Sequence, residues 1–219
     1  MTHSLSLRHP GDGLGVTQYL KDDVRRRILA AALREFSAQG YEGATMAAIA
    51  NAADISTGNV YRYYPGKEKL FEAIVPSALV RRFRALLSER LAAARDLDDV
   101  LELDEEHPYW TAAGRLLEFA IEHRLETIII LGRSVGTRYE TVRQEVVGEL
   151  VGAARDHSPA LARHMEQSPA LAFDLEEIYR NYVASLVRIL ERFDRPEDIR
   201  DATRAYERYH LAGLVGMLG

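Results

Sequence analysis

The chain contains no cysteine, and this absence excludes disulfide bridges, zinc sites built from thiolates and cysteine nucleophiles. Tryptophan occurs only once, and no stretch approaches the roughly 18 consecutive apolar residues that a membrane-spanning helix needs. The start of the sequence also lacks the apolar core of a signal segment. These absences favour a soluble protein of the cytoplasm, where thiols stay reduced.

Signatures of common enzyme classes are also missing, among them the His-Glu-x-x-His zinc motif and the phosphate-binding loop. Glu207-x-x-His210 has the helical spacing of half a dinuclear metal site, and Glu118 and Glu122 lie four residues apart. A second Glu-x-x-His is absent. We therefore expect no catalytic residue, no metal and no cofactor, and a carboxylate-bridged metal enzyme stays as an alternative.

What the chain does contain is a pair of short helical stretches between residues 45 and 67, separated by a tight turn. Thr45 is suited to cap the first helix, and Ser56 is suited to cap the second. Asp54 can adopt the left-handed backbone of a sharp turn, while Ile55 can fill the space between the helices. Pro65 ends the second helix. The pattern predicts a helix-turn-helix.

The second helix carries side chains that suit a DNA groove. A glycine inside a helix costs roughly 1 kcal/mol relative to alanine, so Gly58 is best explained by a large partner that approaches closely. Hydroxyl and amide groups can bind base edges, tyrosines and arginine can reach phosphates, and a lysine at the next helix start suits a phosphate site. The predicted DNA-binding residues are Thr45, Ser56, Thr57, Gly58, Asn59, Tyr61, Arg62, Tyr64 and Lys67.

The segment from roughly residue 25 to 74 resembles the DNA-binding domain of the TetR (tetracycline repressor) family. That family's pattern runs Gly-Val-Ser-x-Gly-x-Leu-Tyr-x-Tyr-Phe-x-x-Lys-x-x-Leu, and the same positions here hold Asp54, Ile55, Ser56, Gly58, Val60, Tyr61, Tyr63, Tyr64, Lys67 and Leu70. Asp54 replaces the turn glycine, and Tyr64 replaces the usual phenylalanine. The resemblance implies a ligand-responsive transcriptional regulator, most often a repressor, that binds a near-palindromic operator in double-stranded DNA as a homodimer.

Charge is distributed unevenly along the chain. The net charge is −5 at pH 7, but residues 21–84 carry +4 and residues 85–219 carry −9. The positive charge lies on the segment with the helix-turn-helix, where it can attract phosphates. The acidic remainder is expected to lie away from the duplex.

The hydrophobic spacing predicts an all-α fold. We expect a flexible arm over residues 1–20, a helix-turn-helix domain over 21–66 whose first helix ends at Gly40, and a helical effector-binding and dimerisation domain over 67–219. Pro76 is expected to bend the connecting helix. In the second domain, helices are expected near residues 109–124, 126–135, 138–156, 170–193 and 197–218.

The last two predicted helices carry an apolar stripe wider than one neighbouring helix would cover. It predicts a four-helix dimer interface made by Leu175, Ile178, Tyr182, Leu186, Tyr206, Tyr209 and Gly213. Burial inside a monomer is the alternative. Trp110, Phe119 and His123 are the predicted contacts of a small, largely apolar effector, although core packing explains them equally well. A helical scaffold that binds only proteins is a second functional alternative.

Overall fold

The computed structural model describes residues 12–94, 104, 106–157 and 159–218. Every regular element in these residues is a helix, which confirms the predicted all-α fold. The helices are α1 (Asp12–Gly43), α2 (Met46–Ala52), α3 (Thr57–Tyr63), α4 (Lys67–Ile74), α5 (Ser77–Ala93), α6 (Pro108–Glu122), α7 (Arg124–Gly132), α8 (Val142–His157), α9 (Pro159–Gln167), α10 (Pro169–Arg192) and α11 (Pro196–Leu218).

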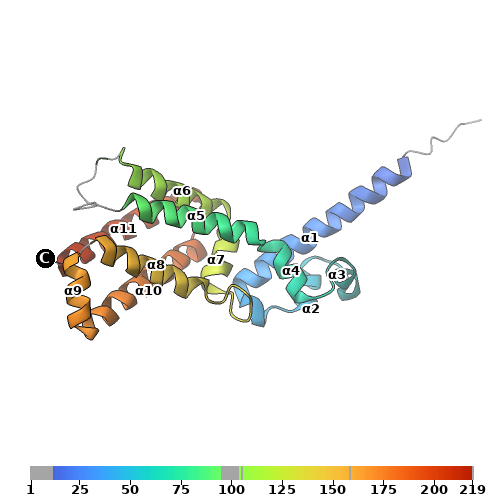
Figure 1. Cartoon of the computed structure of the whole chain (residues 1–219). Coiled ribbons are helices and arrows are strands. Elements are labelled where there is room, and N and C mark those ends of the chain that lie inside the picture. Colours follow the sequence, from blue (N-terminus) through green and yellow to red (C-terminus); the bar gives the residue numbers. More distant parts are fainter. Residues whose placement is uncertain (1–11, 95–103, 105, 158, 219) are drawn as a thin grey trace, which may run out of the picture.

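Helices α1 to α4 form an N-terminal head at one end of the molecule, and α1 projects beyond the other three (Figure 1). Their core is built from fully buried side chains of each helix, such as Phe36, Ile49, Val60 and Leu70. Since α4 shares this core with α1, it packs as part of the head, although the predicted boundary at residue 67 assigns it to the second domain.

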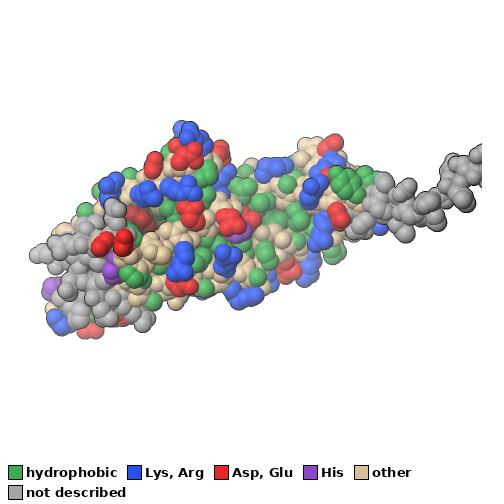
Figure 2. Space-filling view, turned by 90° about the horizontal axis from the view of Figure 1, so that it is seen from above, with side chains coloured by type: hydrophobic (Ala, Val, Ile, Leu, Met, Phe, Trp, Pro, Cys, Tyr) green, Lys and Arg blue, Asp and Glu red, His purple; other side chains and the backbone are tan. Residues whose placement is uncertain are grey.

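Helices α5 to α11 form the larger C-terminal body (Figure 1). The connecting helix is broken at Val75 and Pro76 as the sequence predicts, because proline cannot continue the hydrogen-bond ladder. The strand-like run Ile128–Leu131 lies inside α7 and is almost fully buried. Basic and acidic side chains intersperse over the body on the face shown in Figure 2. No helix among the described residues is both long enough and apolar enough to cross a membrane.

The structure corrects the predicted start of the first helix. Residues 12–20 belong to α1 instead of a flexible arm, since no proline interrupts the chain between Pro10 and Pro65. Residues 1–11 of the predicted arm lie outside the described residues. The sequence also missed α9. Pro159 occupies its first position, where the missing N–H costs nothing. Pro108, Pro169 and Pro196 likewise begin helices, one residue before the predicted starts.

Candidate nucleic-acid interface

The turn between α2 and α3 has the predicted geometry. Thr45 and Ser56 accept hydrogen bonds from the backbone N–H groups of Ala48 (3.1 Å) and Asn59 (3.2 Å), which satisfies one free donor at the start of each helix. Asp54 has a φ of 54°, the left-handed conformation that the sharp turn requires. These interactions set the direction in which α3 leaves the turn.

Arg27 fastens this turn to α1. One nitrogen of its guanidinium donates to the carbonyl oxygens of Ala53 (2.5 Å) and Asp54 (2.8 Å), at the point where α2 has ended and its carbonyls lack helical partners. The sequence interpretation did not single out Arg27, because its partners are backbone atoms 26 and 27 residues away. Its bonds join the turn before α3 to α1.

One face of α3 is buried and the other is open. Val60 is fully buried, whereas Gly58, Tyr61 and Arg62 are exposed; Thr57 and Asn59 are partly exposed. A Cβ atom built at Gly58 would meet nothing within 4 Å, so nothing inside the protein requires a glycine there. The open face of this short helix therefore presents hydroxyl, amide, phenol and guanidinium groups. These are the groups expected to contact base edges and phosphates.

Tyr64 does not share this open face, which corrects its predicted place among the DNA-binding residues. Its side chain is 7% exposed, and its hydroxyl accepts a hydrogen bond from Arg25 Nε at 3.2 Å. The helix ends at Tyr63, so the extended backbone of Tyr64 turns its ring toward α1 and into the core of the head. Tyr64 therefore packs between α3 and α1.

Lys67 also differs from its predicted phosphate-binding position. Its ammonium donates to the backbone carbonyl oxygens of Tyr41 (2.7 Å), Ala44 (3.1 Å) and Glu42 (3.3 Å), and it lies 4.6 Å from the centre of the Tyr41 ring. All three of its protons are thus directed at the end of α1, where carbonyls lack helical partners. The structure gives Lys67 a role in joining α4 to α1.

We expect Lys67→Met to destabilise the protein by about 2 kcal/mol, because carbonyls at the end of α1 lose a charged donor. Urea denaturation measures this loss. The matched control is Lys69→Met on the same helix, where an exposed lysine pairs with Glu72 and the unfolding midpoint should barely move. A Lys67→Met protein of unchanged stability but with a flatter salt dependence of DNA affinity would instead support the predicted phosphate contact.

A junction between head and body lies beside this lysine. The backbone N–H of Tyr41 donates to the carbonyl of Arg133 at 3.1 Å, and the ring of Phe71 lies 6.3 Å from that of Tyr139. Arg138 and Glu72 form an ion pair across the same junction at 3.6 Å. The turn between α7 and α8 therefore contacts both α1 and α4, a connection that the sequence did not reveal because its members are about 70 to 90 residues apart.

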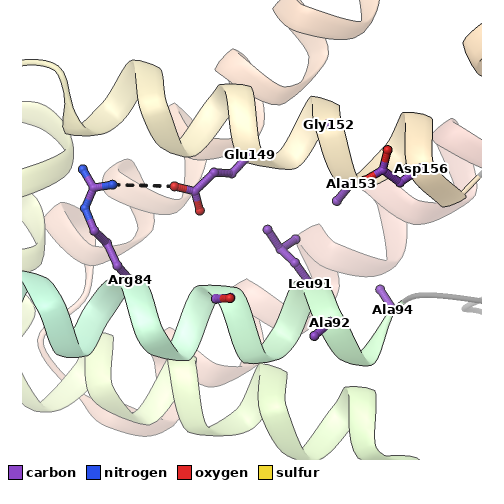
Figure 3. Close-up of a pocket in the computed structure, with 9 residues that line it drawn as sticks. Arg84, Leu91, Ala92, Ala94, Glu149, Gly152, Ala153 and Asp156 are labelled. Carbon is purple, nitrogen blue, oxygen red and sulfur yellow. Dashed lines mark ion pairs between the residues drawn. The ribbon is translucent and has the colours of Figure 1, made fainter.

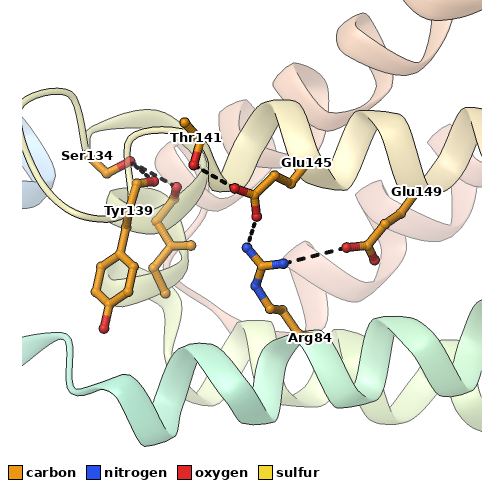
Figure 4. A network of polar contacts seen from close by, with 7 residues as sticks. Arg84, Ser134, Tyr139, Thr141, Glu145 and Glu149 are labelled. Carbon is orange, nitrogen blue, oxygen red and sulfur yellow. Dashed lines mark hydrogen bonds and ion pairs between the residues drawn. The ribbon is translucent and has the colours of Figure 1, made fainter.

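That turn contains Gly-Arg-Ser-Val-Gly at residues 132–136, a spacing also seen around nucleophilic serines. Ser134 is 6% exposed, and its hydroxyl donates to the carbonyl of Tyr139 at 2.9 Å and also lies 3.2 Å from that of Ile130 (Figure 4). The same residues follow a helix, whereas a nucleophile elbow follows a strand. Ser134 therefore closes the turn.

Arg84 joins the connecting helix α5 to α8. Its guanidinium pairs with Glu145 and lies 3.7 Å from Glu149, while Thr141 donates to Glu145 at 2.6 Å (Figure 4). Beyond this pair, a groove of about 460 Å³ separates α5 from α8, and it is lined mainly by small residues such as Ala92, Gly152 and Ala153 (Figure 3). Helices α5 and α8 thus meet through charges more than through packing.

A second cavity, of about 80 Å³, lies on the inner side of α5. It is bordered by α5, α6, α7, α8, α10 and α11, and most of its wall is aliphatic. None of the three predicted effector contacts lines it. Trp110 packs on Tyr109, and Phe119 is 3% exposed with its ring 4.7 Å from that of His123. In this structure, Trp110, Phe119 and His123 pack against neighbouring aromatic rings and do not face the cavity.

The polar side of this cavity is a charge pair. Arg90 and Glu207 are both 13% exposed and lie 3.0 Å apart. Tyr182 donates to Glu207 at 3.2 Å, and Arg90 donates to the Tyr109 hydroxyl at 3.0 Å. Burial would lower the pKa of Arg90, but electrostatic interactions with Tyr182, Tyr109 and Glu207 hold its pKa well above the usual value. Burial raises the pKa of Tyr179 to about 12. Arg90 therefore stays charged and Tyr179 stays neutral.

His210 packs beside this pair, with its ring 4.2 Å from that of Tyr182 and 5.2 Å from that of Tyr179. Burial and the charge of Arg90 lower its pKa from 6.5 to about 4. Because the folded protein binds this proton less readily than the unfolded chain, stability should fall as the pH drops from 6.5 toward 4, by on the order of 2 kcal/mol. Urea denaturation at several pH values measures the loss, and His210→Phe should remove that component.

The residues of the possible metal site do not gather around a common point. Among the described residues, no group of three or more His, Asp or Glu side chains gathers where it could hold a metal ion. Glu207 is paired with Arg90, and Glu118 forms two hydrogen bonds with Arg200, at 2.6 and 2.7 Å.

The predicted dimer stripe divides between the interior and the surface. Leu175 and Tyr182 are almost fully buried within the protomer, which corrects their assignment to an interface: α10 packs on α7 and α8 with that face. Ile178, Leu186 and Tyr206 are partly buried, and Leu186 lines the inner cavity. Tyr209 is 74% exposed and Gly213 is exposed; Phe173, which was not predicted, is 63% exposed.

Comparison with known proteins identifies the head. Residues 28–74 match the family model described as bacterial regulatory proteins, tetR family. A transcriptional repressor, KstR of Rhodococcus jostii, is 44% identical over 62 residues, which cover 28% of this chain and 27% of that protein. The transcriptional regulator BetI of Burkholderia ambifaria is 36% identical over 72 residues, 33% of this chain and 37% of that protein. The matches thus span about a third of these relatives or less.

Solved structures match over more of the chain but less closely. A TetR-like transcriptional regulator from a Rhodococcus species is 26% identical, with a TM-score of 0.42 over 88% of this chain and 96% of that one. The TetR-family regulator PfmR from Thermus thermophilus is 18% identical, with a TM-score of 0.44 over 85% and 97%. The N-terminal head, at residues 28–74, is thus similar to the DNA-binding segment of bacterial regulatory proteins of the tetR family.

Proposed function

We propose that the protein is a transcriptional regulator, most simply a repressor, which binds operator DNA through α3. The observation that carries this proposal is the open face of α3, which follows a turn that Ser56 caps. The residues on this face are exposed or partly exposed: Thr57, Gly58, Asn59, Tyr61 and Arg62. A helix of this length can enter the major groove and place a few side chains on base edges. Two repressors named KstR are 44% and 43% identical to this chain, over 62 and 72 residues.

The regulator acts as a homodimer in this proposal, since one reading helix covers only a few base pairs. Two heads related by a twofold axis would bind successive major grooves about 34 Å apart, so the operator would be a near-palindrome. The exposed apolar groups of α10 and α11, Phe173 and Tyr209, support dimerisation through these helices. The head, as residues 21–66 or with α4 added, and the body would then be separate DNA-binding and dimerisation domains.

Selection from random duplexes, followed by electrophoretic mobility shift, tests DNA binding. The expected product is a near-palindromic sequence that the protein binds more tightly than a scrambled duplex of equal length, with an affinity that falls as salt rises. Equal affinity for both duplexes would contradict sequence-specific reading. An absence of salt-dependent binding would favour the protein-interaction scaffold instead.

Tyr209→Glu should weaken the dimer, because it places a charge where the proposal buries an exposed ring against a second subunit. We expect the dimer dissociation constant to rise roughly tenfold or more. Sedimentation equilibrium measures it. Arg208→Glu, at an exposed neighbour on the same helix, is a control for added charge. A dimer of unchanged strength in Tyr209→Glu would place the interface elsewhere.

An effector would act by binding one arrangement of the two heads better than another, which lowers operator affinity by linkage. The inner cavity is the best-supported site, because it is mostly apolar, carries few polar groups and is bounded by α5, the helix that leads from the head. This replaces Trp110, Phe119 and His123 as the proposed contacts.

A further inference from the structure

We propose that the inner cavity receives the uncharged end of a predominantly apolar molecule, and that Thr127 binds its polar atom. The role of this molecule as an effector rests on the proposed regulatory function. The site itself rests on two independent observations about the cavity wall: a polar side chain that lacks a partner, and a pair of charges that already satisfy each other.

Thr127 is the first of these observations. It lines the cavity from α7, is 3% exposed, and its hydroxyl oxygen makes no hydrogen bond among the described residues. Buried hydroxyls are normally paired, because an unpaired one forfeits the hydrogen bonds that it makes to water in the unfolded chain. A ligand with a carbonyl or hydroxyl group at this position would supply the missing bond.

The charge pair decides the ligand's charge. Arg90 and Glu207 neutralise each other at 3.0 Å, and Tyr109 and Tyr182 bind the same groups. A carboxylate entering the cavity would compete with Glu207 for Arg90, and an ammonium would compete with Arg90 for Glu207. Either ion would leave one charge buried without a partner, a costly state in an aliphatic enclosure. A neutral polar group avoids that cost.

The cavity's size limits what is enclosed. Its volume of about 80 Å³ is small, so it holds one end of a molecule and not a whole drug-sized ligand. Aliphatic side chains such as Leu87, Leu131 and Val183 surround it. They favour an alkyl end over a strongly hydrated one. The enclosed end is therefore short, alkyl and capped by a single neutral oxygen or nitrogen.

Four probes of similar size distinguish a neutral polar group from a charged one: butan-2-one, butan-2-ol, sec-butylammonium and propanoate. Methyl NMR titration of the full chain, without DNA, measures each affinity. The two neutral probes should bind in the millimolar range and shift the Thr127 methyl signal, and the two ions should bind at least about tenfold more weakly. A charged probe that binds as tightly as butan-2-one, or neutral probes that do not bind, would overturn the proposal.

Thr127→Val removes the hydroxyl and keeps the shape of the side chain. We expect it to fold normally and to bind butan-2-one about tenfold more weakly, whereas xenon, which needs no hydrogen bond, should bind at least as well. Thr127→Ser should retain the preference for the ketone, and Thr111→Val, at an exposed position of α6, is the matched control. Unchanged ketone affinity in Thr127→Val would overturn the role of Thr127.

These measurements contain no DNA, so their failure is distinguishable from failure of the regulatory function. A chain that selects an operator but binds no neutral probe keeps the proposed function and loses this inference. A chain that binds the neutral probes through Thr127 but selects no DNA keeps the site and loses the regulator.

Discussion

Gly58→Leu should lower the affinity for the selected operator by on the order of 100-fold while leaving the protein folded. A Cβ at this position would meet nothing within 4 Å in the free protein, so the new side chain has room. The helix should even gain stability, by about 0.5–1 kcal/mol, because glycine is a poor helix residue. Bound DNA would fill that same space, and the loss is comparable to two base contacts at roughly 1–3 kcal/mol each.

Fluorescence anisotropy with the operator measures the affinity, and urea denaturation measures the stability. Gly114→Leu is the matched control, since Gly114 is also an exposed helical glycine with nothing within 4 Å, but lies on α6 in the body. It should leave operator affinity unchanged. If Gly58→Leu binds the operator as tightly as the parent protein, α3 does not enter the groove with this face.

Glu207→Leu should destabilise the protein by about 3–5 kcal/mol, because it leaves Arg90 charged and buried without its partner. Urea denaturation measures this change. The double variant Arg90→Met with Glu207→Leu should recover most of the stability, since removing both charges also removes the cost of burying them. A loss no larger than about 1 kcal/mol in the single variant would mean that water reaches the pair as it reaches a surface salt bridge.

Local features of the head could be predicted from the sequence because each depends on a few neighbouring residues. The caps at Thr45 and Ser56 act within three residues, and the left-handed turn at Asp54 is a property of one residue. Tyr64 and Lys67 lie in the same motif, but in the structure they have partners within the protein that the sequence did not predict. Their partners, Arg25 and the carbonyls near Tyr41, come from α1, more than 20 residues away.

In the body, periodicity predicted which segments are helical but left open what covers each face. Tyr182 and Tyr209 both belong to the apolar stripe, yet one is 4% exposed and the other 74%. The cavity is similar: Arg90, Thr127 and Glu207 come from three helices, and no spacing links them. Periodicity could not distinguish Thr127 from an ordinary helical threonine. Its hydroxyl lacks a hydrogen-bond partner because of how the surrounding helices pack, which the sequence does not show.

The head is joined to the body by the chain at Val75 and Pro76, by the hydrogen bond between Tyr41 and Arg133, and by the pairs Phe71–Tyr139 and Glu72–Arg138. The last three contacts all involve the turn between α7 and α8. A displacement of that turn would therefore carry α1 and α4 with it, and also α3, which shares their core. In a twofold dimer, such a coupled movement would change the separation of the two reading helices.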